Sequence, residues 1–238
     1  SEYLNYDPKN PQWVGRDRFF LDPGHMAPML YSQLCLIGKF SLEELQQLRQ
    51  WGSPTTGHPE FDIARGIENT SGPLGQGHVF AVGAAIAAKF LAAHTGNPTF
   101  AKETIYAYIS DGGVQEEISQ GGARIAATLG LDNLIMFYDS NDIQLSTETK
   151  EVMSEDTGAK YRALGWEVIE ICGNDAAQIR EAIKKAQKVE GKPTLIIGKC
   201  IMGKGSLKAD GSSYEANCKT HGAPLGGDAY INTIKNLG

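Results

Sequence analysis

Short apolar runs alternate with amphipathic stretches along the second half of the chain. The apolar runs are rich in β-branched and aromatic residues, which is typical of buried strands, and they cover residues 104–110, 133–139, 166–171 and 193–198. The stretches between them have helical spacing and cover residues 118–129, 155–164 and 175–189. Strands separated by helices of this length form crossover units. The pattern therefore predicts an α/β fold, a parallel sheet with helices on both faces.

Local signals mark the ends of several helices. Asp175 is a favourable N-cap, and Gly165 is a favourable residue just after a helix. Ser41 and Glu44 form a capping box, which predicts a helix over residues 41–50. These signals agree with the apolar spacing, so local chemistry and hydrophobic pattern point to the same elements.

Two further helices differ in the face they present. The stretch over residues 77–94 is rich in alanine and predicts a helix that packs closely against a neighbour. In residues 118–129, helical spacing places Ile118, Gly122, Ile125 and Leu129 on one face, where Gly122 would let a neighbouring element approach closely. We expect the apolar surface around Leu74, Ile118 and the helix over residues 77–94 to be an uncovered interface.

Long loops rich in Gly, Pro and His cover residues 51–77, 144–153 and 201–228. Loops of this length in a compact domain are more often functional than idle. No helix that would end the domain is evident after Gly226.

Composition narrows the possible classes of protein. The chain has 238 residues with 41% hydrophobic and 21% charged, which fits one globular domain. A net charge of −6 without a basic cluster excludes a nucleic-acid binder. No apolar run reaches the ~20 residues of a membrane span, and no signal peptide is evident, so we expect a cytoplasmic protein. The four cysteines lie far apart and are expected to be free, buried thiols: Cys35, Cys172, Cys200 and Cys218.

Polar residues follow two of the predicted strands. Asp111 and Gly112 follow the strand over residues 104–110, and Asn141 follows the strand over residues 133–139. If these strands are neighbours, the Asp111 carboxylate and the Asn141 amide oxygen converge on a point that suits Mg²⁺ with a bound phosphate. An ordinary turn at Asp111 explains the same residues equally well on spacing alone.

The chain also carries a series of segments that resembles the transketolase family of thiamine-diphosphate enzymes. The metal motif of that family resembles Ser110-Asp-Gly-Gly-Val-Gln-Glu116 followed by Asn141-Asp-Ile143. The family's histidine segments resemble residues 16–25, 57–60 and 220–226, and its cofactor loop resembles residues 72–77. Order and spacing match from about residue 6 to the end.

The resemblance implies a transketolase activity: transfer of a two-carbon glycolaldehyde unit from a ketose phosphate of the xylulose 5-phosphate type to an aldose phosphate of the ribose 5-phosphate type. It implies thiamine diphosphate, which acts through a carbanion, with Mg²⁺ or Ca²⁺ as cofactors. It also implies a homodimer in the pentose phosphate pathway. Other thiamine-diphosphate enzymes, such as 1-deoxyxylulose-5-phosphate synthase, and a noncatalytic cofactor-binding module are the alternatives.

The resemblance also implies roles for individual residues. The expected metal ligands are Asp111, the Asn141 side chain and the Ile143 carbonyl. The expected cofactor contacts are His25, Gly112 and His221 at the diphosphate, Gly72 and Leu74 at the rings, and Leu145 as a wedge for the bent cofactor. The expected catalytic residues are His58, at the hydroxyl or carbonyl of the donor sugar, His221, and Glu116, at the dimer interface near the partner's proton-relay carboxylate.

Several of these residues have plainer explanations. Leu74 and Leu145 could be core leucines, and Glu116 could be part of a charged first helical turn. His78 and His94, on the alanine-rich helix, are interpreted as structural or exposed.

The chain departs from the family pattern at identifiable points. Ser110 replaces a glycine, and Gly121 stands where many relatives carry a second relay carboxylate. No glutamate is a candidate for activating the aminopyrimidine, because Glu60 and Glu68 are expected in loops on the substrate side. We interpret residues 1–238 as a single diphosphate-binding domain that lacks the pyrimidine-binding and C-terminal domains. The chain would then be a fragment of a longer polypeptide or, alternatively, the N-terminal subunit of a split enzyme.

Overall fold

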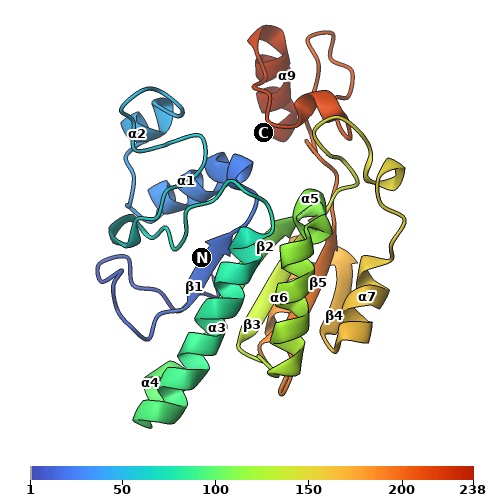
Figure 1. The fold of residues 1–238 in the computed structure, drawn as a ribbon. Coiled ribbons are helices and arrows are strands. Elements are labelled where there is room, and N and C mark those ends of the chain that lie inside the picture. Colours follow the sequence, from blue (N-terminus) through green and yellow to red (C-terminus); the bar gives the residue numbers. More distant parts are fainter. Residues whose placement is uncertain (1) are drawn as a thin grey trace.

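The computed structural model describes residues 2–238, which are built around a five-stranded sheet (Figure 1). Its spatial order is β1-β2-β3-β5-β4, and every neighbouring pair is parallel. The strands are β1 (Arg18–Leu21), β2 (Ile105–Ser110), β3 (Leu134–Ser140), β4 (Glu167–Cys172) and β5 (Thr194–Lys199). The predicted parallel sheet is confirmed, and the predicted strands agree with β2 to β5 to within one residue. The edge strand β1 was not predicted, because its apolar run of Phe19 to Leu21 is very short.

Helices cover both faces of the sheet, as predicted. They are α1 (Ala27–Leu36), α2 (Leu42–Gln46), α3 (Gln76–Thr95), α4 (Pro98–Ala101), α5 (Asp111–Gln115), α6 (Glu117–Thr128), α7 (Thr157–Leu164), α8 (Ala176–Ala186) and α9 (Gly227–Leu237). Residues of α3, α6 and α7 share one hydrophobic core with the sheet (Figure 1). Helices α1 and α8 pack on the opposite face. The expected caps are present, because the Asp175 side chain accepts backbone hydrogen bonds at the start of α8 and Gly165 ends α7. The capping box at Ser41 is also confirmed, although α2 is shorter than predicted.

The end of the chain corrects one prediction. A helix does follow Gly226, because residues 227–237 form α9. It is tied to the preceding loop by Thr233, whose hydroxyl accepts a hydrogen bond from the backbone of Leu207 at 2.9 Å. The apolar residues of this segment recur at helical spacing, although they remain largely exposed.

The apolar face of α6 is exposed, as predicted for the surface around Ile118. Ile118, Ile125 and Leu129 are 49%, 51% and 52% exposed. A neighbouring face of small residues packs inward, since Ser119, Ala123 and Ala126 are buried. Gly122 lies at the edge of this face, and a Cβ on it would lie 3.2 Å from Val79 of α3. Large apolar residues of α3 are exposed as well. We call the following set the α3–α6 surface: Phe80, Phe90, Ile118, Ile125 and Leu129.

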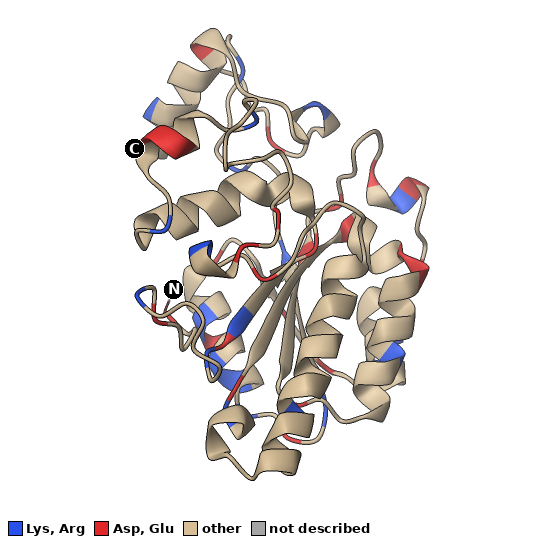
Figure 2. Cartoon of the chain, turned by 60° about the vertical axis from the view of Figure 1, so that its left-hand side comes forward, with Lys and Arg blue, Asp and Glu red and all other residues tan. Residues whose placement is uncertain are grey.

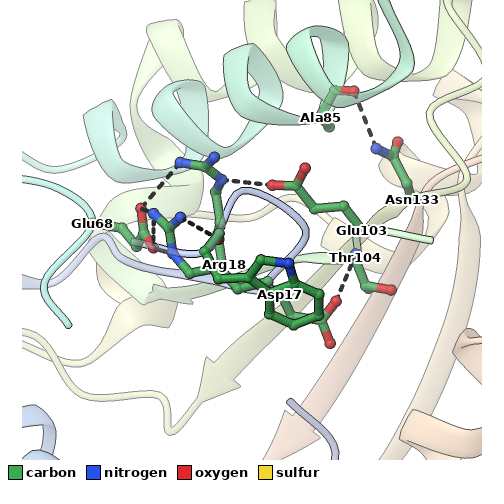
Figure 3. Close-up of polar contacts among 9 residues, drawn as sticks. Asp17, Arg18, Glu68, Ala85, Glu103, Thr104 and Asn133 are labelled. Carbon is green, nitrogen blue, oxygen red and sulfur yellow. Dashed lines mark hydrogen bonds and ion pairs between the residues drawn. The ribbon is translucent and has the colours of Figure 1, made fainter. Parts of the chain in front are cut away.

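A buried ion-pair network closes the amino end of the sheet (Figure 3). Arg16 and Glu68 are 4% and 5% exposed and form an ion pair of 2.9 Å. Arg18 contacts both Glu68, at 3.4 Å, and Glu103, at 2.6 Å. Close by, the Asp17 carboxylate accepts a backbone hydrogen bond from Thr104 at 2.8 Å. Glu68 therefore lies at the amino end of the sheet, and the prediction that it lies on the substrate side is wrong.

Charge and cysteine placement bear on the sequence predictions. Lys and Arg are spread over many elements rather than gathered on one (Figure 2). All four cysteines are free, as predicted, but none is buried: Cys172 is exposed and the others are partly exposed.

By length and composition, α3 could cross a membrane, and it is the one such helix in residues 2–238. One of its faces packs on the sheet, as in a core helix.

His78 is structural, as interpreted from the sequence. It is fully buried in α3, and its Nδ1 atom lies 2.7 Å from the Ser119 hydroxyl. Burial lowers the pKa of His78 from 6.5 to about 4. The unfolded chain therefore binds a proton below pH 6.5 that the folded chain does not accept until about pH 4. The free energy of unfolding therefore decreases as the pH is lowered from 6.5 to about 4.

We expect a His78→Asn variant to lose this pH dependence, because asparagine keeps a nitrogen facing Ser119 but does not titrate. Between pH 7.5 and 5.5, the free energy of unfolding of the wild type should fall by about 1 kcal/mol more than that of the variant. Chemical denaturation at the two pH values measures this difference. Equal pH dependence in both proteins would contradict the assigned pKa.

Candidate functional site

The carboxyl ends of three adjacent strands carry acidic or amide side chains. Asp22 follows β1, Asp111 follows β2 and Asn141 follows β3. Because these strands are neighbours in a parallel sheet, the residues meet at one edge. The backbone N–H of Asn141 donates to Asp111 Oδ2 at 3.0 Å, so the two residues are in contact, through the backbone of Asn141 and not through the side-chain oxygen that the prediction named.

Asp111 is held rigidly. Its side chain is 2% exposed, Tyr138 donates its hydroxyl to Oδ1 at 2.6 Å, and Asp142 donates its backbone N–H to Oδ2 at 3.2 Å. Burial raises the pKa of the Asp111 carboxyl, and the hydrogen bonds from Tyr138 and Asn141 oppose this shift. A carboxylate fixed in this way is preorganised, and Oδ1 keeps a lone pair beyond the one Tyr138 uses.

The turn after β3 brings Asn141 and Ile143 to the same place. The Asn141 side-chain oxygen accepts the Ile143 N–H at 3.0 Å, and Asp142 has a left-handed backbone with φ of 64°. No group of three or more His, Cys, Asp or Glu residues that could hold a metal occurs within residues 2–238. A cation here would rely on one carboxylate and neutral oxygens, a donor set that suits a hard ion also bound by phosphate.

The predicted histidines lie together. The ring centroids of His25 and His221 are 4.7 Å apart. A Cβ on Gly24 would lie 2.8 Å from the Gly72 nitrogen and 2.9 Å from the His58 ring, so the three segments are in close contact. The structure therefore joins segments that are about 200 residues apart in sequence.

The cluster favours neutral imidazoles. Burial, together with the nearby His221, His58 and Arg49, lowers the pKa of His25 to about 4, and burial also lowers the pKa of His221. His221 Nδ1 is buried and has no hydrogen-bond partner within residues 2–238. A neutral imidazole with a free nitrogen can donate to an anionic ligand that enters the cluster.

The loop over residues 72–77 rests on the turn after β2. A Cβ on Gly112 would lie 2.8 Å from the Leu74 side chain, and a Cβ on Gly75 would lie 2.8 Å from Cβ of Glu116. Gly75 also has φ of 83°, which favours glycine. The glycines therefore allow the loop over residues 72–77 to lie directly against the turn after β2, and a side chain at either position would push the two segments apart.

Two predicted residues lie at the surface. Leu145 is 73% exposed, so its interpretation as a core leucine is wrong. Glu116 is also exposed, at the start of α6. Leu74 is half-buried.

Two hollows flank the cluster. One has a volume of about 720 Å³ and is lined by Asp111, Tyr138, Asp142 and Lys199, among others. The other is an open hollow of about 920 Å³ on the histidine side, and its lining includes Arg49, Trp51 and His58. The sequence analysis did not identify Tyr138, Arg49 or Asp22. Asp22 had a signal, since it follows a short apolar run as Asp111 does.

Together these features define an α/β cofactor-binding domain whose sheet edge suits a hard cation and a diphosphate. The family described as "Transketolase, thiamine diphosphate binding domain" matches residues 1–238. The chain belongs to this family.

Individual relatives agree with this assignment. Transketolase 1 of Pasteurella multocida is 44% identical over 231 residues, which are 95% of this chain and 34% of the relative. Transketolase 2 of Escherichia coli is 42% identical over 100% of this chain and 36% of its own length. The structure of a Pichia stipitis transketolase mutant, H261F, has a TM-score of 0.92 at 36% identity and covers 99% of this chain and 35% of its own. The chain thus spans about one third of the length of these relatives.

Proposed function

We propose that this chain is the diphosphate-binding part of a transketolase that transfers a two-carbon unit from a ketose phosphate to an aldose phosphate. The observation that carries the proposal is the meeting of the Asp111–Asn141 turn, the histidine cluster and the glycine loop over residues 72–77 at one sheet edge. Its family membership and named relatives support the same activity. We place the enzyme in the cytoplasm and in the pentose phosphate pathway.

The residues present fit the cofactor and its metal. Asp111, the Asn141 side chain and the Ile143 carbonyl would hold Mg²⁺ or Ca²⁺. The cofactor would contact His25, His221 and Gly112 with its diphosphate, Gly72 and Leu74 with its rings, and Leu145 at its bend. The unpaired Nδ1 of His221 and the contact of the glycine loop with the Asp111 turn support this fit. When bound, thiamine diphosphate supplies the nucleophilic carbon that carries the two-carbon unit.

The remaining histidine chemistry concerns the substrate. His58 is exposed beside the open hollow, where it can hydrogen-bond the hydroxyl or carbonyl of the donor sugar. His221, held partly buried beside His25, can accept or return a proton at the sugar hydroxyl. Arg49 lines the same hollow, and its charge favours an anionic sugar phosphate.

A pyrimidine-binding domain would complete the site, and a homodimer would bring it there. The α3–α6 surface supports this proposal, because exposed apolar residues of this size mark interaction sites. Glu116 begins α6 beside this surface, where a partner's carboxylate could share a proton with it.

The activity is testable with the native full-length protein. We expect it to convert xylulose 5-phosphate and ribose 5-phosphate to products only when thiamine diphosphate and Mg²⁺ are both supplied, and chelation should abolish turnover. A protein that binds the cofactor but transfers no ketol group would contradict the proposal and favour a noncatalytic binding module.

We expect the histidines to divide into two groups. His58→Ala should lower kcat/KM for the donor at least tenfold while the Kd of thiamine diphosphate changes less than threefold, because His58 lies on the exposed side of the cluster. His25→Ala and His221→Ala should also raise the Kd of the cofactor. Steady-state kinetics and calorimetry on the same preparations separate these effects. Equal loss of cofactor binding in all three variants would refute the division.

A further inference from the structure

Asp22 is a buried carboxylate that the proposed mechanism does not use. It is 1% exposed and follows β1 directly, three residues before His25. Its backbone N–H donates to the Tyr108 carbonyl of β2 at 3.0 Å, which fixes it to the neighbouring strand. A buried carboxylate is costly, so its contacts need a reason.

The first contact is with the start of α3. Asp22 Oδ1 accepts the backbone N–H of Gly77 at 2.9 Å and that of His78 at 3.4 Å. These are N–H groups of the first helical turn, which have no partner inside the helix. Asp22 therefore anchors the helix that ends the glycine loop over residues 72–77.

Two glycines pack so closely against Asp22 that neither position has room for a side chain. A Cβ on Gly77 would lie 2.5 Å from Cα of Asp22, and a Cβ on Gly113 would lie 2.4 Å from Asp22 Oδ2. Gly113 belongs to α5, directly after Asp111 and Gly112. Asp22 thus lies where three segments meet: the segment that leads to His25, the glycine loop and the turn that carries Asp111.

The second carboxylate oxygen is unusual. Asp22 Oδ2 is buried and has no hydrogen-bond partner in the part of the chain that the structure describes, and the same holds for His78 Nε2 and the Tyr161 hydroxyl. Burial raises the pKa of the Asp22 carboxyl. Polar atoms left unpaired in a protein interior cost stability, so the position is not explained by stability alone.

We propose that Asp22 is a positioning residue that holds the His25 segment, the glycine loop and the Asp111 turn in the arrangement that thiamine diphosphate requires. The inference rests on the proposed function, because it takes those three segments to be the cofactor's contacts. It adds to that function a residue that touches neither metal nor cofactor and acts through backbone hydrogen bonds.

Asp17 provides a matched control. It is a carboxylate buried to a similar degree, 5% exposed, just before the other end of β1. It also accepts backbone hydrogen bonds, from Asn5 and Thr104, both at 2.8 Å. Burial raises the pKa of Asp17 as it does that of Asp22. The two residues therefore share burial and chemistry, and they differ in which end of the sheet they fix.

The test compares Asp22→Ala, Asp22→Asn and Asp17→Ala in the native full-length protein. Calorimetric titration with thiamine diphosphate in saturating Mg²⁺ measures Kd, and thermal denaturation without cofactor measures stability. We expect both alanine variants to lower Tm, but only Asp22→Ala to raise Kd, at least tenfold. Asp22→Asn should restore Kd to within threefold of wild type, because its amide oxygen can accept the same N–H groups.

Other results would overturn the assignment in distinct ways. If the wild type binds the cofactor and Asp22→Ala binds it equally well, the positioning role is wrong while the proposed function stands. An equal rise in Kd for Asp17→Ala would show a general effect of instability. If the wild type does not bind at all, the proposed function fails, and the role of Asp22 with it. Should Asp22→Ala not fold, Asp22→Val fills the space of the carboxylate without its acceptor and carries the same expectation.

Discussion

Replacement of Asp111 by alanine is expected to weaken thiamine-diphosphate binding by at least a hundredfold in the native full-length protein with saturating Mg²⁺. Asp111 is the only proposed metal ligand with a formal charge, and a divalent cation held by neutral oxygens alone binds weakly. Without the cation, nothing would link the diphosphate to the oxygen atoms of the turn. The protein would have to bind the cofactor through its histidines alone.

The fold should survive this change. Alanine at position 111 leaves the Tyr138 hydroxyl and two backbone N–H groups without their acceptor, at a cost of about 1–3 kcal/mol for each group that stays unpaired. Water in the adjacent hollow of about 720 Å³ can reach these groups, which limits the loss. Circular dichroism should therefore be unchanged while calorimetry shows the loss of binding.

Asp142→Asn is the matched control for the Asp111 variant. Asp142 lines the same hollow but is 61% exposed and is paired with Lys199 at 2.6 Å. Asparagine tolerates the left-handed backbone at this position, so the change removes one charge and little else. We expect the Kd of the cofactor to change less than threefold. If metal-dependent binding persisted in Asp111→Ala, or fell equally in Asp142→Asn, the metal site would have to lie elsewhere.

The sequence predicts this part of the site well because it depends on local order. Asp111 and Asn141 each follow a strand with a strong apolar pattern, and two neighbouring parallel strands must bring their ends together. The partner of Asp111, Tyr138, could not be read in the same way. An inward-facing tyrosine in an apolar strand looks like any other core residue until the direction of its hydroxyl is known.

Other parts of the fold depend on contacts that no local pattern encodes. The approach of His25 to His221 joins the start and the end of the chain, and only the resemblance to a family suggested it. The role of Glu68 was mistaken because its loop also carries residues of the site, while the loop itself runs between opposite ends of the sheet. By contrast, the exposure of the α6 surface around Ile118 was predicted, from apolar residues that this domain alone leaves uncovered.

A second large effect is expected when residues 1–238 are expressed alone. The rate of ketol transfer should then be at least a thousandfold below that of the native full-length protein. We propose that the chain supplies the metal turn and the histidines for the diphosphate, and that the carboxylate for the aminopyrimidine comes from another domain. Glu68 is buried in the ion-pair network at the far end of the sheet, and Glu116 lies at the start of α6.

The same isolated chain should also associate with itself. The α3–α6 surface exposes Phe80 by 47%, Phe90 by 62% and the three aliphatic residues of α6 by about half, and exposed apolar surface of this kind promotes association. Light scattering after gel filtration should show oligomers. Phe90→Glu and Ile125→Glu together should reduce them, because a buried unpaired charge opposes association. Lys102→Glu makes the same change in net charge at an exposed lysine that has no ion pair within residues 2–238, and this control should leave association unchanged.

Addition of a separately expressed pyrimidine-binding domain of a relative distinguishes an incomplete site from an inactive one. If that domain binds the α3–α6 surface and supplies the missing carboxylate, ketol transfer should appear in proportion to the complex formed. The Phe90→Glu and Ile125→Glu variant should then fail to gain activity, although its own metal turn is intact. Turnover by a monodisperse monomer of residues 1–238 alone would show that the site needs no second domain, and the proposal of a site shared across an interface would be wrong.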